Sequence, residues 1–190
     1  MGFADEVWWS RFAQPRICTW TAAENQQRLH QKSRPKNDPD PKALACYGLL
    51  LRQAHWPEDQ MLLRFVDGRP VSAITTQFLA WSCEQLAAQG VTALLLIWDN
   101  ATWHKSNIVR DWIREHNQQV KKKGSGVRIL PFLLPVKSPW LNPIEPKWVH
   151  GKRAVVEPDD LLSAYTLADR VCDYFGCSHE AHVKYKCDGR

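Results

Sequence analysis

Five stretches of the chain have the apolar, β-branched and aromatic composition that is typical of β-strands. They cover residues 16–21, 44–51, 61–66, 93–98 and 127–134. The fourth stretch is apolar at every position, as expected for a central strand that is covered on both faces. The first five residues are also mostly apolar, and we interpret them as the end of another strand.

Three longer stretches repeat their apolar positions every three to four residues and therefore predict amphipathic helices. They cover residues 71–89, 105–120 and 159–175. The first and third are followed by Gly90 and Gly176, a residue type that favours the end of a helix. The third begins after Pro158 with two acids, which suit the positive end of a helix dipole. Strands and helices in this order predict an α/β domain with a mixed sheet.

The positive charge of the chain is concentrated in one quarter of its length. The protein has 190 residues and a formal net charge of +5, whereas residues 105–153 hold eleven Lys or Arg against three acids, a net charge of +8. A basic segment of this kind favours a polyanion such as nucleic acid as the partner. The alternative is a solvated helix face followed by a basic loop.

Other features of the composition exclude some classes of protein. No run of about 18 apolar residues exists, so the sequence predicts no membrane span. The start lacks the basic and apolar regions of a signal peptide, and the six cysteines form no paired framework. We therefore expect a reduced, cytoplasmic protein.

Acidic residues stand at three places where chemistry is plausible. Asp99 directly follows the apolar strand 93–98, at the end where ligands collect in α/β sheets. Its alternative role is a turn or capping acid. Glu145 follows Asn142 and Pro143, so that it can serve as the glutamate of a capping box at a helix start.

The third place is the adjacent pair Asp5 and Glu6. Alternation along a strand sends them to opposite faces, so that at most one of them should join a site with Asp99. The three acidic positions together predict a carboxylate cluster for a hard divalent cation, which prefers oxygen ligands.

Three segments resemble the catalytic blocks of mariner-like DDE transposases, in the bacterial insertion-sequence branch. Ala-Asp-Glu at 4–6, followed by two tryptophans, is similar to the first block. Trp-Asp-Asn-Ala-Thr-Trp-His at 98–104 is similar to the second, and Lys-Ser-Pro-Trp-Leu-Asn-Pro-Ile-Glu-Pro-Lys-Trp at 137–148 to the third. The resemblance covers roughly residues 3–180, and the third block is the most specific.

The resemblance implies an RNase H-like domain over residues 1–180, with a mixed five-stranded sheet flanked by helices, and a tail at 181–190. It implies that Asp5, Asp99 and Glu145 bind two Mg²⁺ or Mn²⁺ ions from the first strand, the end of the fourth strand and a later helix. The implied activity is metal-dependent endonucleolytic cleavage of DNA at transposon ends, followed by strand transfer into target DNA. We expect double-stranded DNA, a separate helix-turn-helix part of the same transposase and a second copy of the chain as partners.

Basic residues in the charged segment are the expected phosphate contacts. They are Lys105, Lys121, Lys122, Lys123, Lys137, Lys147, Lys152 and Arg153.

Two features depart from the family pattern. Asp99 and Glu145 are 46 positions apart, an interval that is longer than usual, and we assign the extra length to a Lys- and Gly-rich loop at 118–126. Only four residues precede Asp5, so we expect a truncated first strand and no helix-turn-helix region within this chain.

Two smaller signals have conservative interpretations. The segment 177–187 has zinc-like residue types, but its spacing matches no standard zinc finger, and we interpret it as an ordinary tail. We interpret His104 as a surface residue at a helix start.

Two further functions remain open beside the transposase. One is another RNase H-like nuclease, and the other is a non-catalytic DNA-binding remnant. The convergence of three carboxylates would distinguish the enzymes from the remnant.

Overall fold

The computed structural model describes residues 1–12, 35–155 and 161–185. A mixed sheet with the order β5-β4-β1-β2-β3-β6 forms its centre. The strands are β1 Gly2–Ser10, β2 Ala43–Leu51, β3 Gln60–Asp67, β4 Ala93–Trp98, β5 Arg128–Leu133 and β6 Val183–Lys184. β1, β2 and β3 pair antiparallel, whereas β4 is parallel to both β1 and β5. The α/β class and the mixed sheet are therefore as the sequence predicts.

The first strand is longer than expected. β1 has nine residues, all of which pair with β2, and Asp5 lies in its interior opposite Gly48. The expectation of a truncated first strand was wrong because the strand continues through the polar residues to Ser10. The predicted strand at 16–21 lies outside the described residues.

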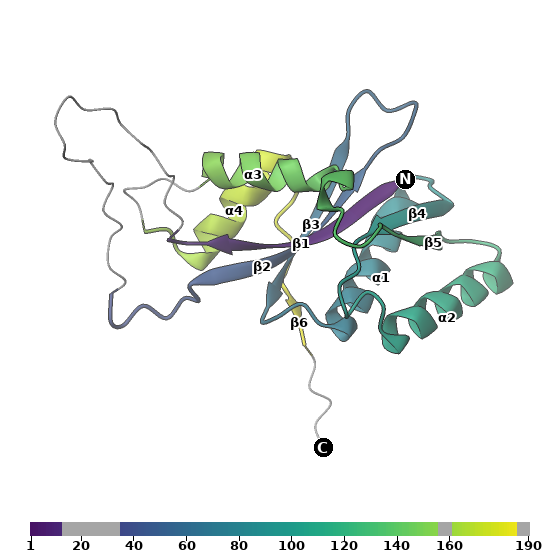
Figure 1. Cartoon of the computed structure of the whole chain (residues 1–190), viewed down its shortest axis with the longest axis horizontal. Helices are drawn as coiled ribbons and strands as arrows, with labels where there is room; N and C mark the ends of the chain where they lie inside the picture. The colour runs from purple at the N-terminus through teal and green to yellow at the C-terminus, as the bar shows by residue number, and fades with distance from the viewer. Residues whose placement is uncertain (13–34, 156–160, 186–190) are drawn as a thin grey trace, which may run out of the picture.

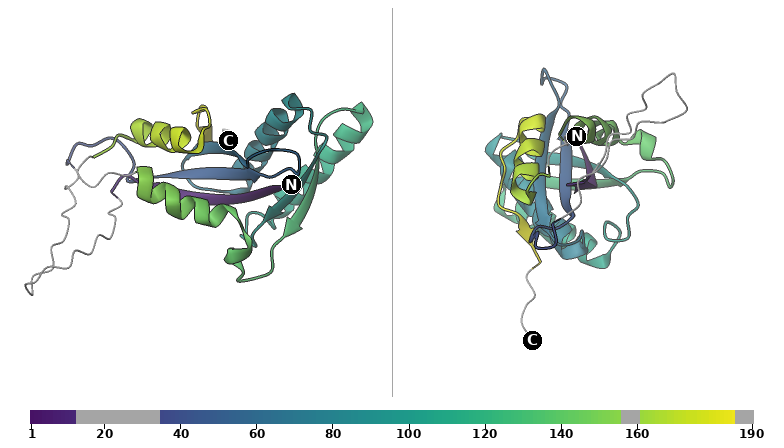
Figure 2. Two further views of the ribbon diagram at one scale, coloured as in Figure 1. Left: turned by 90° about the horizontal axis from the view of Figure 1, so that it is seen from above. Right: turned by 90° about the vertical axis from the view of Figure 1, so that its left-hand side faces the viewer.

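Helices pack on both faces of this sheet. They are α1 Ser72–Ala88, α2 Asn107–Lys123, α3 Ile144–Val155 and α4 Ala164–Phe175, with a short 3₁₀ turn, η1, at Pro139–Leu141. α3 and α4 lie on one face and α1 on the other, and Figure 2 shows α1 and α2 beside one part of the sheet and α3 and α4 beside another. Figure 1 gives the arrangement as a whole.

Two helix boundaries differ from the prediction. α2 continues to Lys123 and ends at Gly124, whose φ of 68° is left-handed. The expected lysine-rich loop is therefore a helical end, where three basic side chains suit the negative end of the helix dipole. α4 begins at Ala164 with Ser163 as its N-cap, later than expected, and the two acids at 159–160 lie outside the described residues.

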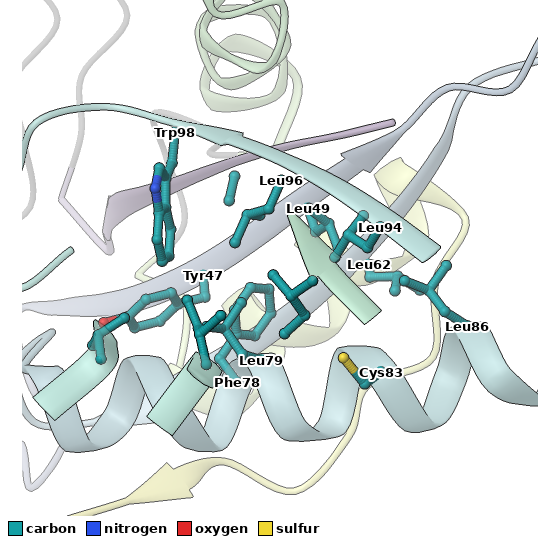
Figure 3. Close-up of a cluster of buried hydrophobic side chains, with 14 of the residues drawn as sticks. Tyr47, Leu49, Leu62, Phe78, Leu79, Cys83, Leu86, Leu94, Leu96 and Trp98 are labelled. Carbon is teal, nitrogen blue, oxygen red and sulfur yellow. The ribbon is translucent and has the colours of Figure 1, made fainter. Parts of the chain in front are cut away.

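Alternation along the strands separates two hydrophobic cores. One lies between the sheet and α1, where Tyr47, Leu49 and Leu96 meet Phe78 and Leu79, as Figure 3 shows. The other lies under α3 and α4. It contains Phe3, Val7, Trp9, Phe65, Trp148 and Leu167. β1 contributes to both cores, so that neighbouring residues of β1 face different helices.

A sixth strand extends the expected five. β6 pairs parallel with β3 through Val66 and Val183, so residues 183–184 are part of the sheet rather than of a separate tail. Within the described part of the chain, no helix has the length and apolarity needed to cross a membrane.

Candidate active site

Asp99 lies immediately beyond the carboxyl end of β4, as predicted. Its Oδ1 atom accepts a hydrogen bond from the backbone N–H of Ala101 at 2.9 Å, which is the turn role that the sequence left open. The same atom lies 2.8 Å from Nδ1 of His104. The hydrogen bond from His104 holds the pKa of Asp99 below its usual value. Asp99 is therefore an ionised turn acid whose Oδ2 atom is not engaged by the described residues.

His104 is buried, contrary to our interpretation of it as a surface residue. Only 3% of it is exposed, and its ring stacks on Trp98 with centroids 4.5 Å apart. Its Nε2 atom lies 2.8 Å from Oε1 of Glu6, so that the imidazole bridges two carboxylates. Burial alone would lower the pKa of His104, but the hydrogen bonds and charges of Asp99 and Glu6 raise it to about 9. At neutral pH His104 is a cation between two anions.

Asp5 faces the opposite side of β1 and meets α3. Its Oδ2 atom accepts a hydrogen bond from Nε1 of Trp148 at 2.9 Å. Trp148 reaches this position because Gly48, the cross-strand partner of Asp5, has no side chain, and a Cβ there would overlap the indole. Burial raises the pKa of Asp5 to about 7, and the charge of Glu145 acts in the same direction.

Glu145 is the second residue of α3 and lies in its first turn. Burial raises its pKa, as does the charge of Asp99. The capping box is absent from the described residues: Asn142 instead donates from Nδ2 to the carbonyl of Ala4 at 3.2 Å, and its Oδ1 atom has no hydrogen-bond partner. Glu145 is therefore not held as a helix cap.

The three predicted acids lie on the elements that the resemblance implied, and Glu145 interacts electrostatically with each of the two aspartates. Continuing the parallel pairing of Phe3 with Ile97 by two residues brings Asp5 level with Asp99. Glu145 approaches from α3 and perturbs Asp5, while Asp99 perturbs Glu145. Among the described residues, however, no group of three or more His, Cys, Asp or Glu side chains is arranged to hold a metal ion. The site is a set of mutually repelling carboxylates that come from three elements.

Sequence reasoning weighed Glu6 but gave it no role in this site, and it placed His104 at the surface. The alternation rule did separate Asp5 from Glu6, and Glu6 is the one that joins the hydrogen-bond network of Asp99. The sequence signal that could have identified His104 was its position five residues after Asp99, in the turn that leads into α2. The partner of its Nε2 atom, Glu6, lies 98 positions away, and no local pattern reveals that contact.

The basic residues predicted as phosphate contacts lie at different places on the fold. Lys121, Lys122 and Lys123 form the last turn of α2, close in sequence to the start of β5 and so at the opposite end of the parallel strands from Asp99. Lys105 lies near enough to Asp99, and Lys152 near enough to Glu145, for each positive charge to lower the pKa of its neighbouring acid. The remaining basic residues are exposed, after β5 and on α3. They are Lys137, Lys147 and Arg153.

Solved structures with the same fold include three of Mos1. The Mos1 transposase paired-end complex with left transposon end has a TM-score of 0.64 at 16% identity, over 93% of this chain and 48% of that chain. The Mos1 mariner paired end complex with Mn gives 0.61 at 16% identity over 93% and 48%, and the Mos1 Strand Transfer Complex gives 0.57 at 16% identity over 93% and 47%. The likeness shows a common mixed α/β, RNase H-like fold, and this chain spans about half the length of the Mos1 chains.

A family comparison reaches a more specific result. Comparison with curated protein sequences gives no match. Residues 57–163 match the family described as DDE superfamily endonuclease. This segment contains Asp99 and Glu145 and makes up more than half of the 190 residues. The chain therefore belongs to the DDE superfamily of endonucleases.

Proposed function

We propose that this chain is the catalytic domain of a mariner-like transposase of the insertion-sequence type, which cuts DNA at transposon ends and joins the ends to target DNA. The observation that carries the proposal is the approach of Asp5, Asp99 and Glu145 from β1, the end of β4 and α3, with Glu145 near enough to interact electrostatically with both aspartates. Membership of the endonuclease superfamily and the fold of Mos1, which is known in complexes with a transposon end and with Mn, support it.

Two Mg²⁺ or Mn²⁺ ions are the expected cofactors, held by Asp5, Asp99 and Glu145. The donor set fits such ions: the donors are carboxylate oxygens, and burial and mutual repulsion raise the pKa of two of them, a penalty that a dication removes. When bound, such ions activate a water or hydroxyl and stabilise the leaving oxygen of a phosphodiester.

The residues around the acids prepare them for this role. His104 holds Oδ1 of Asp99 and leaves Oδ2 available. Trp148 fixes Oδ2 of Asp5 and covers that side of the carboxylate with a buried ring. Glu145 lies on a helix whose buried face, including Ile144 and Trp148, packs on the sheet. Asp5 and Asp99 are therefore each oriented by a hydrogen bond from a neighbouring side chain, while α3 sets the position of Glu145.

Metal-dependent cleavage tests the proposal directly. The tag-free chain is incubated with supercoiled plasmid in Mg²⁺ or Mn²⁺, and nicking is compared with that by Asp5→Asn, Asp99→Asn and Glu145→Gln. We expect each substitution to abolish nicking, because a neutral amide is a poor ligand for a hard dication. Glu115→Gln, on the exposed side of α2, is the matched control and should keep the activity.

A second measurement separates metal binding from turnover. Fe²⁺ bound in place of Mg²⁺, with ascorbate and peroxide, should cleave the backbone near residues 5, 99 and 145, and excess Mg²⁺ should suppress these cuts. Equal nicking by wild type and all three variants, or cuts that do not map to these segments, would refute the assignment.

A non-catalytic DNA-binding remnant is the alternative. It is favoured by the absence, within the described ranges, of a ready group of three metal-ligating side chains. DNA binding without metal-localised cuts and without nicking would select it. Nicking that persists in Glu145→Gln would instead select another type of RNase H-like nuclease.

Double-stranded DNA is the proposed partner, and two sets of basic residues test its position. Replacing Lys105, Lys137 and Lys152 by Gln should reduce the slope of log affinity against log salt by up to about 2.7 units, because each phosphate contact contributes about 0.9. The same change at Lys121, Lys122 and Lys123 is the matched control, and we expect a smaller reduction because these residues lie at the other end of the parallel strands. An equal or larger effect of the control would place DNA along α2 instead.

Sequence reading at the transposon ends belongs, in this proposal, to a separate helix-turn-helix part, and a homodimer would bring two ends together. Contacts to phosphates carry no sequence information directly. The chain alone should therefore bind a transposon-end duplex and a scrambled duplex with similar affinity.

A further inference from the structure

Two histidines outside the candidate active site are brought together by the return of the chain from α4 to the sheet. After Gly176 ends α4, the chain passes through residues 177–182 and pairs as β6 with the edge of β3. This path places His179 beside Asp169 of α4 and His182 beside Asp67 at the end of β3. Both rings also pack near Phe65, with centroid distances of 5.9 and 5.5 Å.

The two imidazoles face each other through the same ring atom. Nε2 of His179 lies 3.2 Å from Nε2 of His182. Their other ring nitrogens face carboxylates: Nδ1 of His179 is 2.6 Å from Asp169, and Nδ1 of His182 is 2.8 Å from Asp67. The arrangement is therefore symmetrical, with a carboxylate, two imidazoles and a second carboxylate in a row.

The carboxylates fix the tautomer of each ring. An ionised carboxylate only accepts hydrogen bonds, so that Nδ1 of each histidine carries the hydrogen. Each neutral ring then has a lone pair on Nε2, and the two lone pairs point at each other across 3.2 Å. Such an arrangement needs a positive charge between the two nitrogens, which is either a shared proton or a metal ion.

The distance suits a metal. With zinc–nitrogen bonds of about 2.0–2.1 Å and a tetrahedral angle, two imidazole nitrogens lie about 3.3 Å apart. Histidines that bind metals almost always donate their other N–H to a carboxylate or carbonyl, which is the role that Asp169 and Asp67 have here. The two rings are also only partly exposed, with 13% and 20% of their side-chain surfaces accessible.

We propose that His179 and His182 form a binding site for a transition-metal dication such as Zn²⁺, through their Nε2 atoms. Since the described residues contain no group of three or more metal-ligating side chains, two histidines are the protein ligands and water completes the coordination. Imidazole nitrogens favour Zn²⁺, Cu²⁺ and Ni²⁺ over Mg²⁺, so the site differs in chemistry from the carboxylates near Asp99 and does not depend on the proposed function.

A metal at this position would join α4 and β6, which are consecutive in the chain, to β3, which is distant in sequence. His179 is anchored to α4, and His182 is anchored to β3 and followed directly by β6. Binding would fasten the two-residue strand β6 to the sheet edge. A ligand that binds only the folded state stabilises it, and at a concentration of about 100 times Kd the melting temperature should rise by roughly 5–10 °C.

Zinc titration of the full chain, with any affinity tag removed, tests the site. We expect one equivalent of Zn²⁺ to bind in calorimetry and to raise Tm. Mg²⁺ at the same concentration should do neither. His179→Ala and His182→Ala should each lose this binding, and Asp67→Asn or Asp169→Asn should weaken it by about 10–100-fold. His55→Ala, an exposed histidine in the connection between β2 and β3, is the matched control.

Two further measurements keep the result unambiguous. Asp99→Asn should retain the zinc equivalent, which separates it from the proposed catalytic ions. Nitrogen-15 spectra of wild-type histidines should show Nδ1–H tautomers for His179 and His182 and a shift of both Nε2 resonances with Zn²⁺, a readout that needs no folded variant. Unchanged binding in both alanine variants, or a wild type that binds no Zn²⁺ because the rings share a proton, would overturn the proposal.

Discussion

Asp5 and Glu6 are neighbours on β1, and the fold accommodates their two buried carboxylates in different ways. Asp5 faces α3, where it accepts a hydrogen bond from the neutral indole of Trp148, and burial together with the charge of Glu145 raises its pKa to about 7. Glu6 faces the other side and contacts His104, whose pKa rises to about 9. The surroundings of Asp5 favour the protonated form of its carboxyl group, whereas Glu6 is paired with the cationic side chain of His104. A dication therefore has more to neutralise near Asp5 and Glu145 than near Glu6.

The largest effect should come from removing the internal cation. His104→Ala leaves Glu6 and Asp99 without their shared partner, and breaking such a buried pair costs about 3–5 kcal/mol. Urea unfolding at pH 7 measures the loss. His150→Ala, on the exposed side of α3, should change the free energy of unfolding by less than about 0.5 kcal/mol. A similar small change for His104→Ala would mean that Glu6 does not need a cation.

The opposite sign is expected on the other face. Asp5→Asn removes a carboxylate whose ionisation is disfavoured in the fold, while the amide oxygen can still accept from Trp148. In the presence of a chelator at pH 8, we expect stabilisation on the order of a few kcal/mol. Asp111→Asn, at an exposed position on α2, is the control. A destabilised Asp5→Asn would show that the carboxylate itself supports the fold.

The pH dependence of stability should separate the two faces. A raised pKa means that the folded state binds more protons than the unfolded state between the two values. Stability in chelator should therefore fall as pH rises from about 4 to about 7 because of Asp5, and again from about 6.5 to about 9 because of His104. Asp5→Asn should flatten the first fall and His104→Gln the second, when Tm is followed against pH. If either substitution flattened the wrong interval, the assignment of the two pKa values would be reversed.

The smallest effect is expected at Glu145. It is half-buried, it has no capping contact among the described residues, and its pKa is raised by burial and by Asp99. Glu145→Gln should stabilise the chain by less than about 1 kcal/mol in chelator, since solvent screens much of the repulsion. Thermal unfolding beside Glu115→Gln measures the difference. A clear loss of stability would restore the capping role that the sequence suggested.

The comparison also shows what the sequence can reveal about this molecule. Alternation along β1 placed Asp5 and Glu6 on different faces, and the apolar run at 93–98 is a strand, because both patterns depend only on the geometry of a strand. That strand, β4, is second from the edge of the sheet rather than central, and its alternate residues are only partly buried. The capping box at Asn142 is not formed: the side-chain amide donates to the carbonyl of Ala4, a contact far away in sequence that the local pattern does not reveal. The burial of His104 was missed for the same reason: its second partner lies on a different strand.

The missing side chain of Gly48 makes β2 important for a site to which it contributes no charged group. Any side chain at position 48 would displace the indole of Trp148, and with it the hydrogen bond to Asp5 and the seat of α3 that carries Glu145. In a scan of all substitutions, position 48 should thus tolerate as few replacements as the acids themselves. Gly48, which does not contact the substrate, would then be as intolerant of substitution as a catalytic acid. Mutational tolerance alone would therefore not distinguish a residue that positions the site from one that takes part in the reaction.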